Sequence, residues 1–239
     1  MIGLGTLVNV LAVLMGGLIG LFFHGGLKER FQNILLKSLG LSIMFIGISG
    51  ALENMLKINE NSLEASGIML LVISLVTGSL LGEWINIEKR MEDFGEWLKM
   101  KVTAKSGSTF VEGFVTSSLV ICVGAMAIIG SLQDGLYGDA TLLFTKSILD
   151  FVFILISAST LGLGVVFSAI PLGLYQGLIT VFAQYIQPLL TDKIISDLSL
   201  VGSVLIFAIG VNQVFGQKFK VGNMLPAIVI AVICSVLNI

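Results

Sequence analysis

A few charged and amide residues lie inside long apolar segments of this chain, and their types and spacing could support chemistry. Lys146 and Asp150 form the clearest pair, because a spacing of four places both on one face of a helix. Ionisable groups at membrane depth are costly and usually mark an ion or substrate path. The pair is therefore a candidate coupling or substrate-binding group. An interfacial ion pair, with Lys146 extended toward the membrane surface, is the alternative interpretation.

The segment Ser131–Asp139 is the densest polar stretch near a boundary of the internal repeat described below. Its glycines, Gly135 and Gly138, permit a turn whose carbonyl groups could help to hold a cation. The spacing is not that of a regular calcium loop, so the metal is unknown, and a plain turn outside the membrane is the alternative. The candidate side chains of this segment are Gln133, Asp134 and Asp139.

Other polar side chains also fall within the apolar segments or at their ends. Tyr175 and Gln176 are candidates for binding a transported solute, and the secondary candidates are Asn9, Glu112, Asn212 and Asn223. Buried amides can instead link helices by hydrogen bonds. A carboxylate at Glu112 could simply favour the dipole at the start of a helix.

No catalytic arrangement of residues is visible, so we expect that the protein is not an enzyme and needs no cofactor. The single histidine, His24, lies where a helix should end, and it lacks the partners of a catalytic triad or a zinc site. Metalloprotease and phosphate-loop motifs are missing from the sequence. Cys122 and Cys234 lie in apolar runs and are expected to be buried packing residues.

The composition is that of a membrane protein. Of the 239 residues, 56% are hydrophobic and only 12% are charged, whereas a soluble domain carries about 25% charged residues. The mean hydropathy is +1.03. The net charge of −2 argues against a nucleic-acid partner. The bilayer is therefore the expected environment, and an all-α polytopic membrane protein is the expected fold class.

Eight segments approach the roughly 20 apolar residues that a membrane-spanning helix needs. The first lacks a basic start, so we interpret it as a transmembrane helix and not as a cleavable signal. The fifth and sixth are separated by a loop or by a re-entrant break among Gly162, Gly164 and Pro171. The eight segments are Leu4–Phe23, Ile34–Leu52, Ser66–Ile85, Phe110–Leu132, Leu142–Leu163, Pro171–Gln187, Leu198–Phe215 and Val221–Ile239.

Basic residues favour one orientation of these eight segments in the membrane. Ten lysines and arginines fall on one side, and three (Lys57, Lys146 and Lys193) fall on the other. Because cytoplasmic loops are enriched in Lys and Arg, both termini should face outward. A seven-helix arrangement would split the basic clusters. The ten are Lys28, Arg30, Lys37, Lys89, Arg90, Lys99, Lys101, Lys105, Lys218 and Lys220.

A weak internal repeat suggests a duplicated membrane domain. Gly26-Leu27 precedes Lys37-Ser38 by the same spacing as Gly135-Leu136 precedes Lys146-Ser147, at an offset of 109 residues. Three helices per copy would make the two repeats inverted, as in many secondary transporters. The expected organisation of this single membrane domain is a first repeat at 1–85, a linker at 86–109, a second, inverted repeat at 110–190 and a C-terminal helical hairpin at 191–239.

The linker and the glycines add two expectations about packing. Asn86–Val102 has apolar residues at spacings of three and four, which predicts an amphipathic helix on the cytoplasmic membrane surface. A charged linker helix without membrane contact is the alternative. Three G-x-x-x-G pairs predict close helix packing, and one such face could support a homodimer. The pairs are Gly16/Gly20, Gly78/Gly82 and Gly173/Gly177.

Several motifs resemble one bacterial family along nearly the whole chain. They are Gly5-Thr-Leu-Val-Asn9, Gly40 to Gly47, Phe110-Val-Glu-Gly-Phe114, Cys122 to Met126, Gly130 to Gly135, Lys146-Ser-Ile-Leu-Asp150, Tyr175-Gln-Gly177 and Gly222 to Pro226. The sequence resembles the domain-of-unknown-function 554 family of YdfK/YqgA-type bacterial membrane proteins. The resemblance implies a multi-pass protein of the bacterial cytoplasmic (inner) membrane, and it implies no activity.

Two functions remain in view at this point. The first is a secondary transporter or channel for a small ion or polar solute, with its site between the inverted repeats and driven by an ion gradient unless it is passive. The second is a non-transporting membrane regulator or scaffold that acts through the amphipathic helix. The substrate, the coupling ion, the direction of transport and the oligomeric state stay open.

Overall fold

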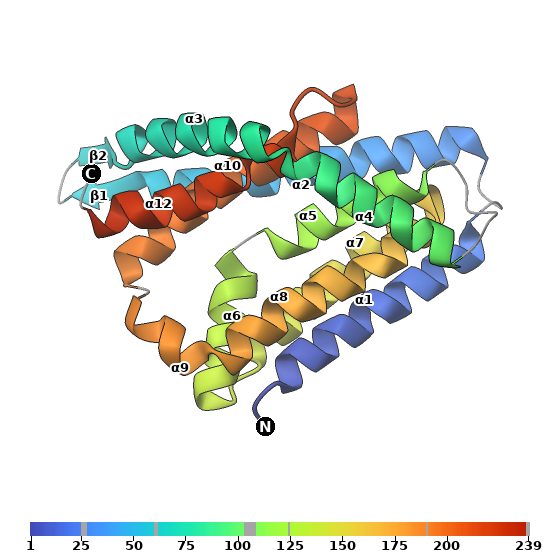
Figure 1. Cartoon of the computed structure of the whole chain (residues 1–239), viewed down its shortest axis with the longest axis horizontal. Coiled ribbons are helices and arrows are strands. Elements are labelled where there is room, and N and C mark those ends of the chain that lie inside the picture. The colour runs from blue at the N-terminus through green and yellow to red at the C-terminus, as the bar shows by residue number, and fades with distance from the viewer. Residues whose placement is uncertain (25–27, 60–61, 103–108, 124, 190, 238–239) are drawn as a thin grey trace. The chain divides into compact units, whose positions relative to one another are not determined.

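The structure is a computed structural model that describes all residues except 25–27, 60–61, 103–108, 124, 190 and 238–239 (Figure 1). It is almost wholly helical. The elements are α1 (Leu4–Phe23), α2 (Glu29–Met55), β1 (Leu56–Asn59), β2 (Ser62–Ala65), α3 (Ile68–Ile85), α4 (Ile87–Val102), α5 (Phe110–Cys122), α6 (Ala125–Tyr137), α7 (Thr141–Leu161), η1 (Leu163–Ser168), α8 (Ala169–Val181), α9 (Ala183–Ile186), η2 (Gln187–Leu189), α10 (Asp192–Phe215), α11 (Val221–Met224) and α12 (Pro226–Val236).

Among the described residues, six helices are long and apolar enough to cross a membrane, which makes this an all-α membrane protein. They are α1, most of α2, α3, α7, the continuous stretch Leu163–Val181 and α10. The bent pair α5 and α6 would add a seventh crossing, and Val221–Val236 is a shorter apolar helix. The predicted total of eight, the inverted repeats and the membrane-surface helix stay predictions.

Helices from distant parts of the sequence form two compact units. Unit 1 consists of Met1–Leu39, Met91–Cys122 and Met126–Leu189. Unit 2 consists of Gly40–Arg90, Val123–Ala125 and Leu190–Ile239. These units are composed differently from the predicted repeats, because α1 packs with helices of the second predicted repeat.

In unit 1, α1 lies directly against α7, and it also packs against α8 (Figure 1). Glycines make this close approach possible. A Cβ atom at Gly16 would lie 2.7 Å from the backbone oxygen of Phe151, and one at Gly20 would overlap the backbone oxygen of Leu155. Small residues let helices approach in lipid, where packing contacts drive helix association. The predicted G-x-x-x-G contact of α1 thus has α7 as its partner.

The predicted break between the fifth and sixth segments lies at Gly162. This residue ends α7 with a φ of 80°, a conformation that glycine adopts without a steric penalty. The chain then turns through η1 directly into α8, with Pro171 in the first turn of α8. The helix that follows the break therefore starts before Pro171, and α8 ends at Val181 instead of continuing to Gln187.

The segment predicted over Phe110–Leu132 is not one continuous helix in the structure. Two helices, α5 and α6, replace it, and their axes meet at 61°. The prediction of a turn over Ser131–Asp139 was wrong, because α6 stays helical to Tyr137 and only the residues from Gly138 form the turn. A Cβ at Gly135 would meet the backbone oxygen of Thr180, so this glycine serves helix packing.

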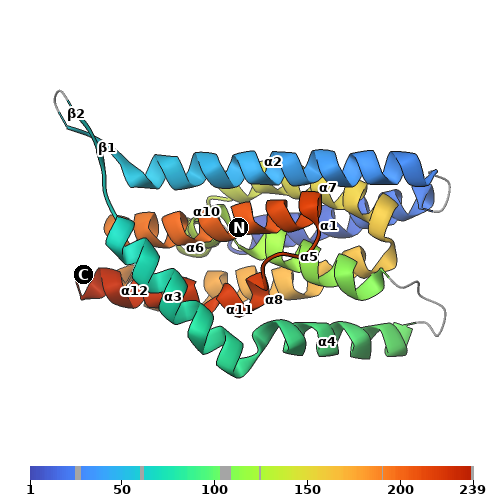
Figure 2. The same ribbon diagram turned by 90° about the horizontal axis from the view of Figure 1, so that it is seen from above.

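In unit 2, α3 packs against α11 and α12, as both ribbon views show (Figures 1 and 2). The contact again uses a predicted glycine pair, because Gly78 and Gly82 face the backbone of Ala227 and Asn223. A two-stranded antiparallel hairpin, β1 and β2, joins α2 to α3 where the sequence predicted a loop. Cys234 belongs to the apolar core of this unit, as predicted.

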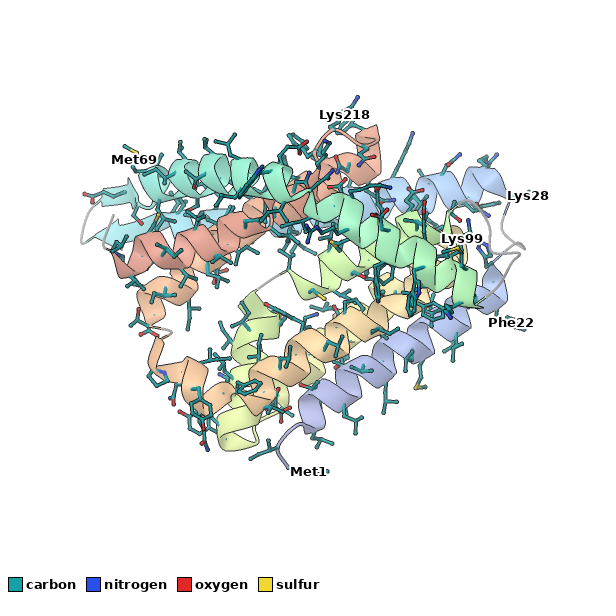
Figure 3. The ribbon with its side chains drawn as sticks, in the orientation of Figure 1. Met1, Phe22, Lys28, Met69, Lys99 and Lys218 are labelled. Atoms are coloured by element: carbon teal, nitrogen blue, oxygen red, sulfur yellow. The ribbon has the colours of Figure 1, made fainter. Side chains whose placement is uncertain are left out.

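Helix α4 covers the predicted linker segment. Its residue Leu98 is buried against Phe110 and Phe114 of α5 in unit 1. Figure 3 shows Lys28 and Lys99 toward the Phe22 end of α1, and Met1 at the other end. The first copy of the sequence repeat begins at Gly26-Leu27, which lies outside the described residues.

Candidate functional site

The predicted Lys146–Asp150 pair forms in the first half of α7 and is buried. The Lys146 Nζ donates to Oδ2 of Asp150, and each residue is only 7% exposed. Both side chains lie on the helix face that also carries Leu143, Ser147 and Ile154. Lys146 is therefore turned toward Asp150 and packed within the helices of unit 1.

A buried amide pair joins α1 to α8 within the same unit. The Asn9 side chain donates its Nδ2 to Oε1 of Gln176 over 3.3 Å, and both residues are fully buried. The Asn9 side chain also lies near the Asp150 carboxylate. Asn9, Lys146, Asp150 and Gln176 thus meet where three helices pack together, and we call these four residues the buried polar cluster.

The hydrogen bonds of the buried polar cluster are incomplete. Oδ1 of Asn9 and Nε2 of Gln176 are fully enclosed and have no hydrogen-bond partner. A buried polar atom without a partner costs about 1–3 kcal/mol, so native proteins carry few of them and those few need a reason. The cluster therefore presents one unused acceptor and one unused donor beside an ion pair.

Two further side chains adjoin the buried polar cluster. The Cys122 thiol, at the last residue of α5, lies close enough to Lys146 and Asp150 to interact with both charges. Tyr175 in turn lies close to Cys122. The last residue of α5, where the bend toward α6 begins, therefore lies within electrostatic range of the ion pair. Interrupted helices beside polar groups are a recurring feature of transporter sites.

Asp134 has a different place, at the start of α1. It is fully buried, and its two carboxylate oxygens accept hydrogen bonds from the backbone N–H groups of Gly3 and Thr6, both at 3.2 Å. These donors belong to the first turn of α1, which has no side-chain cap of its own. Asp134 thus caps α1 from α6 and helps to place Asn9.

The other two candidates from the predicted turn lie apart from the cluster. Asp139 is exposed and accepts a hydrogen bond from the backbone N–H of Thr141 over 3.0 Å. This bond lowers the pKa of the Asp139 carboxyl below its usual value. Gln133 is half-buried in α6. The structure therefore does not bring Gln133, Asp134 and Asp139 together around one cation position.

Asn223 and Asn212 belong to unit 2 and have structural partners. Asn223 is buried, accepts from the backbone N–H of Glu88 over 2.7 Å and donates to Glu83 over 2.7 Å. Asn212 holds the chain at Lys218 and Phe219 through three hydrogen bonds. These contacts fix the corner between α3 and α4 to the residues around α11.

Glu112 is exposed in the first turn of α5, where a carboxylate suits the helix dipole. Within the described parts of the chain, no group of three or more His, Cys, Asp or Glu side chains could hold a metal ion.

Sequence reasoning treated Cys122 as packing and did not single out Glu83 or Glu88. Their positions beside polar partners depend on tertiary contacts that no local pattern reveals.

Comparison with known proteins gives a family and no activity. No solved structure matches the chain significantly. It is 32% identical to the "Uncharacterized membrane protein YdfK" of Bacillus subtilis (strain 168) over 226 residues, which cover 95% of this chain and 93% of the relative. It is 30% identical to the "Uncharacterized protein YqgA" of Escherichia coli (strain K12) over 235 residues, 95% and 94% of the two chains. The family described as "Protein of unknown function (DUF554)" matches residues 4–236, and the chain belongs to this family of membrane proteins.

Proposed function

We propose that the protein is a secondary transporter or channel for a small ion or polar solute, and that the solute passes through the buried polar cluster. The single observation that carries the proposal is the buried Lys146–Asp150 pair beside the unpaired amide atoms of Asn9 and Gln176. Gln133, Asp134, Asp139 and Tyr175 then flank or support the path.

The energetic argument starts from the cost of the buried charges. Removing two charges from water costs several kcal/mol for each ion, and a well-packed apolar pair of similar volume is often as stable or more stable. Stability alone therefore gives little reason to keep Lys146 and Asp150 inside an apolar helix. Charged side chains in membrane segments usually line substrate or proton paths.

The helix arrangement supports the same proposal. Asn9 comes from α1, in the first predicted repeat, whereas Asp150 and Gln176 come from α7 and α8, in the second. A site where two repeats meet beside an interrupted helix is the usual design of secondary transporters. The energy source would be an ion gradient, or none if the protein is a passive channel.

A flux measurement tests the proposal without knowledge of the substrate. The protein is reconstituted in liposomes, and trapped indicators report the entry of protons, sodium and potassium. Stopped-flow light scattering reports the entry of urea, glycerol and glycine. We expect at least one flux above that of protein-free liposomes, and we expect the double variant Lys146→Gln/Asp150→Asn to lose it. Equal flux in the wild type and in protein-free liposomes for every probe would overturn the proposal.

Helix α4 supports a second candidate function, a regulator or scaffold without transport. The Phe94 and Trp97 rings stack at 5.7 Å, and both are more than 40% exposed. Such a pair of exposed aromatic rings could bind the membrane interface or a protein partner. The test introduces variant genes into a strain that lacks the gene. Under this alternative, Phe94→Ser/Trp97→Ser fails to restore the wild-type phenotype of that strain, whereas Lys146→Gln/Asp150→Asn restores it. The opposite pattern favours transport.

A further inference from the structure

We infer that the solute of the buried polar cluster is a zwitterion of the α-amino acid class, with its carboxylate bound by Lys146 and its ammonium bound by Asp150. This inference rests on the proposed transport function and specifies its substrate. In the unliganded state, Lys146 and Asp150 bind each other. On binding, each would exchange its partner for the opposite charge of the solute.

The charge balance of the cluster selects this class of solute. The cluster holds one positive and one negative side chain, and both are buried. A lone cation could pair with Asp150 only if it displaced or approached Lys146, which leaves a buried positive charge unpaired. A lone anion that binds Lys146 would in the same way leave the buried negative charge of Asp150 unpaired. A zwitterion satisfies both side chains at once and brings no net charge into the low-dielectric interior.

The unpaired amide atoms extend the match from charge to hydrogen bonding. An ammonium group has three N–H donors, and a carboxylate has about four acceptor positions. Oδ1 of Asn9 has no donor partner, and the Asn9 side chain already reaches the Asp150 carboxylate. These two acceptors can therefore share one ammonium group. Nε2 of Gln176 has no acceptor partner and supplies a second donor for the carboxylate that binds Lys146.

The amide pair offers one unpaired donor and one unpaired acceptor in either orientation. If both amides turn over, Nε2 of Gln176 donates to Oδ1 of Asn9, and the unpaired atoms become a donor on Asn9 and an acceptor on Gln176, so that Asn9 would serve the carboxylate and Gln176 the ammonium. An uncharged solute such as urea could satisfy these two atoms, but it could not replace either partner of the ion pair. A zwitterion is the class of solute that uses all four side chains of the buried polar cluster.

The test uses the full-length protein in liposomes that are preloaded with a mixture of the twenty standard amino acids. Exchange against an external isotope-labelled copy of the mixture is read by mass spectrometry. We expect labelled uptake of one or a few amino acids. For each of these, the methyl ester, which keeps only the ammonium, and the N-acetyl derivative, which keeps only the carboxylate, should compete at least about tenfold more weakly.

Two variants separate binding from folding. Lys146→Gln/Asp150→Asn removes both charges together and leaves no unpaired charge, so it should fold and lose amino acid exchange. Leu174→Ala changes an exposed residue of α8 (64% exposed), so exchange should stay at the wild-type level. If the double variant does not reconstitute, Gln176→Met provides the same test, with an expected loss of at least about tenfold in apparent affinity.

The outcomes also distinguish this inference from the proposed function. Equal competition by the methyl ester would reveal a cation site, and equal competition by the N-acetyl derivative would reveal an anion site; either result overturns the zwitterion. No exchange of any amino acid, together with an ion or urea flux that depends on Lys146 and Asp150, overturns the zwitterion and keeps the transporter. No flux of any probe overturns both.

Discussion

Asn9 in α1 and Gln176 in α8 are 167 residues apart in sequence, and their side chains are joined by a hydrogen bond of 3.3 Å in a fully buried position. Each amide still has one atom without a partner. The pair thus holds two helices together and leaves hydrogen-bonding capacity unused. A structural link and a solute-binding role make different predictions for the same variants.

Replacing both amides by leucine separates these roles. Gln176→Leu alone leaves the Asn9 amide buried without a partner and should destabilise the protein by about 1–3 kcal/mol. Asn9→Leu/Gln176→Leu removes both unpaired atoms of the amide pair and should cost less than the sum of the single variants. If the amides bind solute, the double variant keeps its stability and loses flux. Thermal unfolding in detergent and liposome flux measure the two effects, and unchanged flux in the double variant would contradict a binding role.

The ion pair predicts an asymmetry between single and double variants. Asp150→Asn or Lys146→Gln leaves one buried charge without its partner and should destabilise the protein by about 3–5 kcal/mol. Lys146→Gln/Asp150→Asn removes both charges and should be near the wild type in stability. Thermal unfolding of the three variants in one detergent checks this order. A double variant that is less stable than either single variant would show that the pair contributes mainly to folding.

The glycines of α1 and α8 provide a matched comparison of helix packing. Gly20→Ala places a methyl group on the Leu155 backbone of α7 and should cost about 1–3 kcal/mol or more, because a backbone atom cannot move aside easily. Gly177→Ala is the control, since a Cβ there would meet no atom within 4 Å. It should be neutral or slightly stabilising. Equal unfolding temperatures for the two variants would contradict the close α1–α7 contact.

Features of the fold that depend on residues close together in sequence could be predicted, whereas features that depend on tertiary contacts could not. The first predicted segment matches α1 at both ends, because a long and mainly apolar run without charged residues defines such a helix. The i, i+4 spacing was sufficient to predict the Lys146–Asp150 pair. Asn9 and Gln176 were both singled out as polar residues at depth, but no pattern in the sequence indicated that they meet.

Other features depended on contacts that the sequence does not display. The apolar run from Phe110 to Leu132 contains no proline, so nothing predicted the 61° bend between α5 and α6. Asp134 was taken as part of a cation-binding turn, whereas its carboxylate accepts the N–H groups at the start of α1. A buried carboxylate can cap a helix that is distant in sequence, and only the fold reveals which one.

Asp139 lies outside the apolar segments, and we expect it to make the stability of the folded protein depend slightly on pH. Its pKa lies below the unfolded value of 3.8, because the backbone N–H of Thr141, followed by its side chain, favours the charged carboxylate. The Asp139 carboxylate therefore stabilises the folded protein fully at pH values above the unfolded pKa. This stabilisation is lost as the pH falls through the lower pKa of the folded state. Unfolding temperatures of the wild type and Asp139→Asn should differ at pH 5 and converge as the carboxyl becomes protonated. A difference that grows toward acid pH would contradict this assignment.

The most direct test of the central claim is liposome flux of the wild type beside Lys146→Gln/Asp150→Asn, with both proteins verified as folded and incorporated to the same extent. Our account predicts that the wild type passes at least one of the proton, sodium, potassium, urea, glycerol or glycine probes, and that the double variant passes it at the protein-free rate. A double variant that transports as well as the wild type would contradict the claim that solute passes through the buried polar cluster.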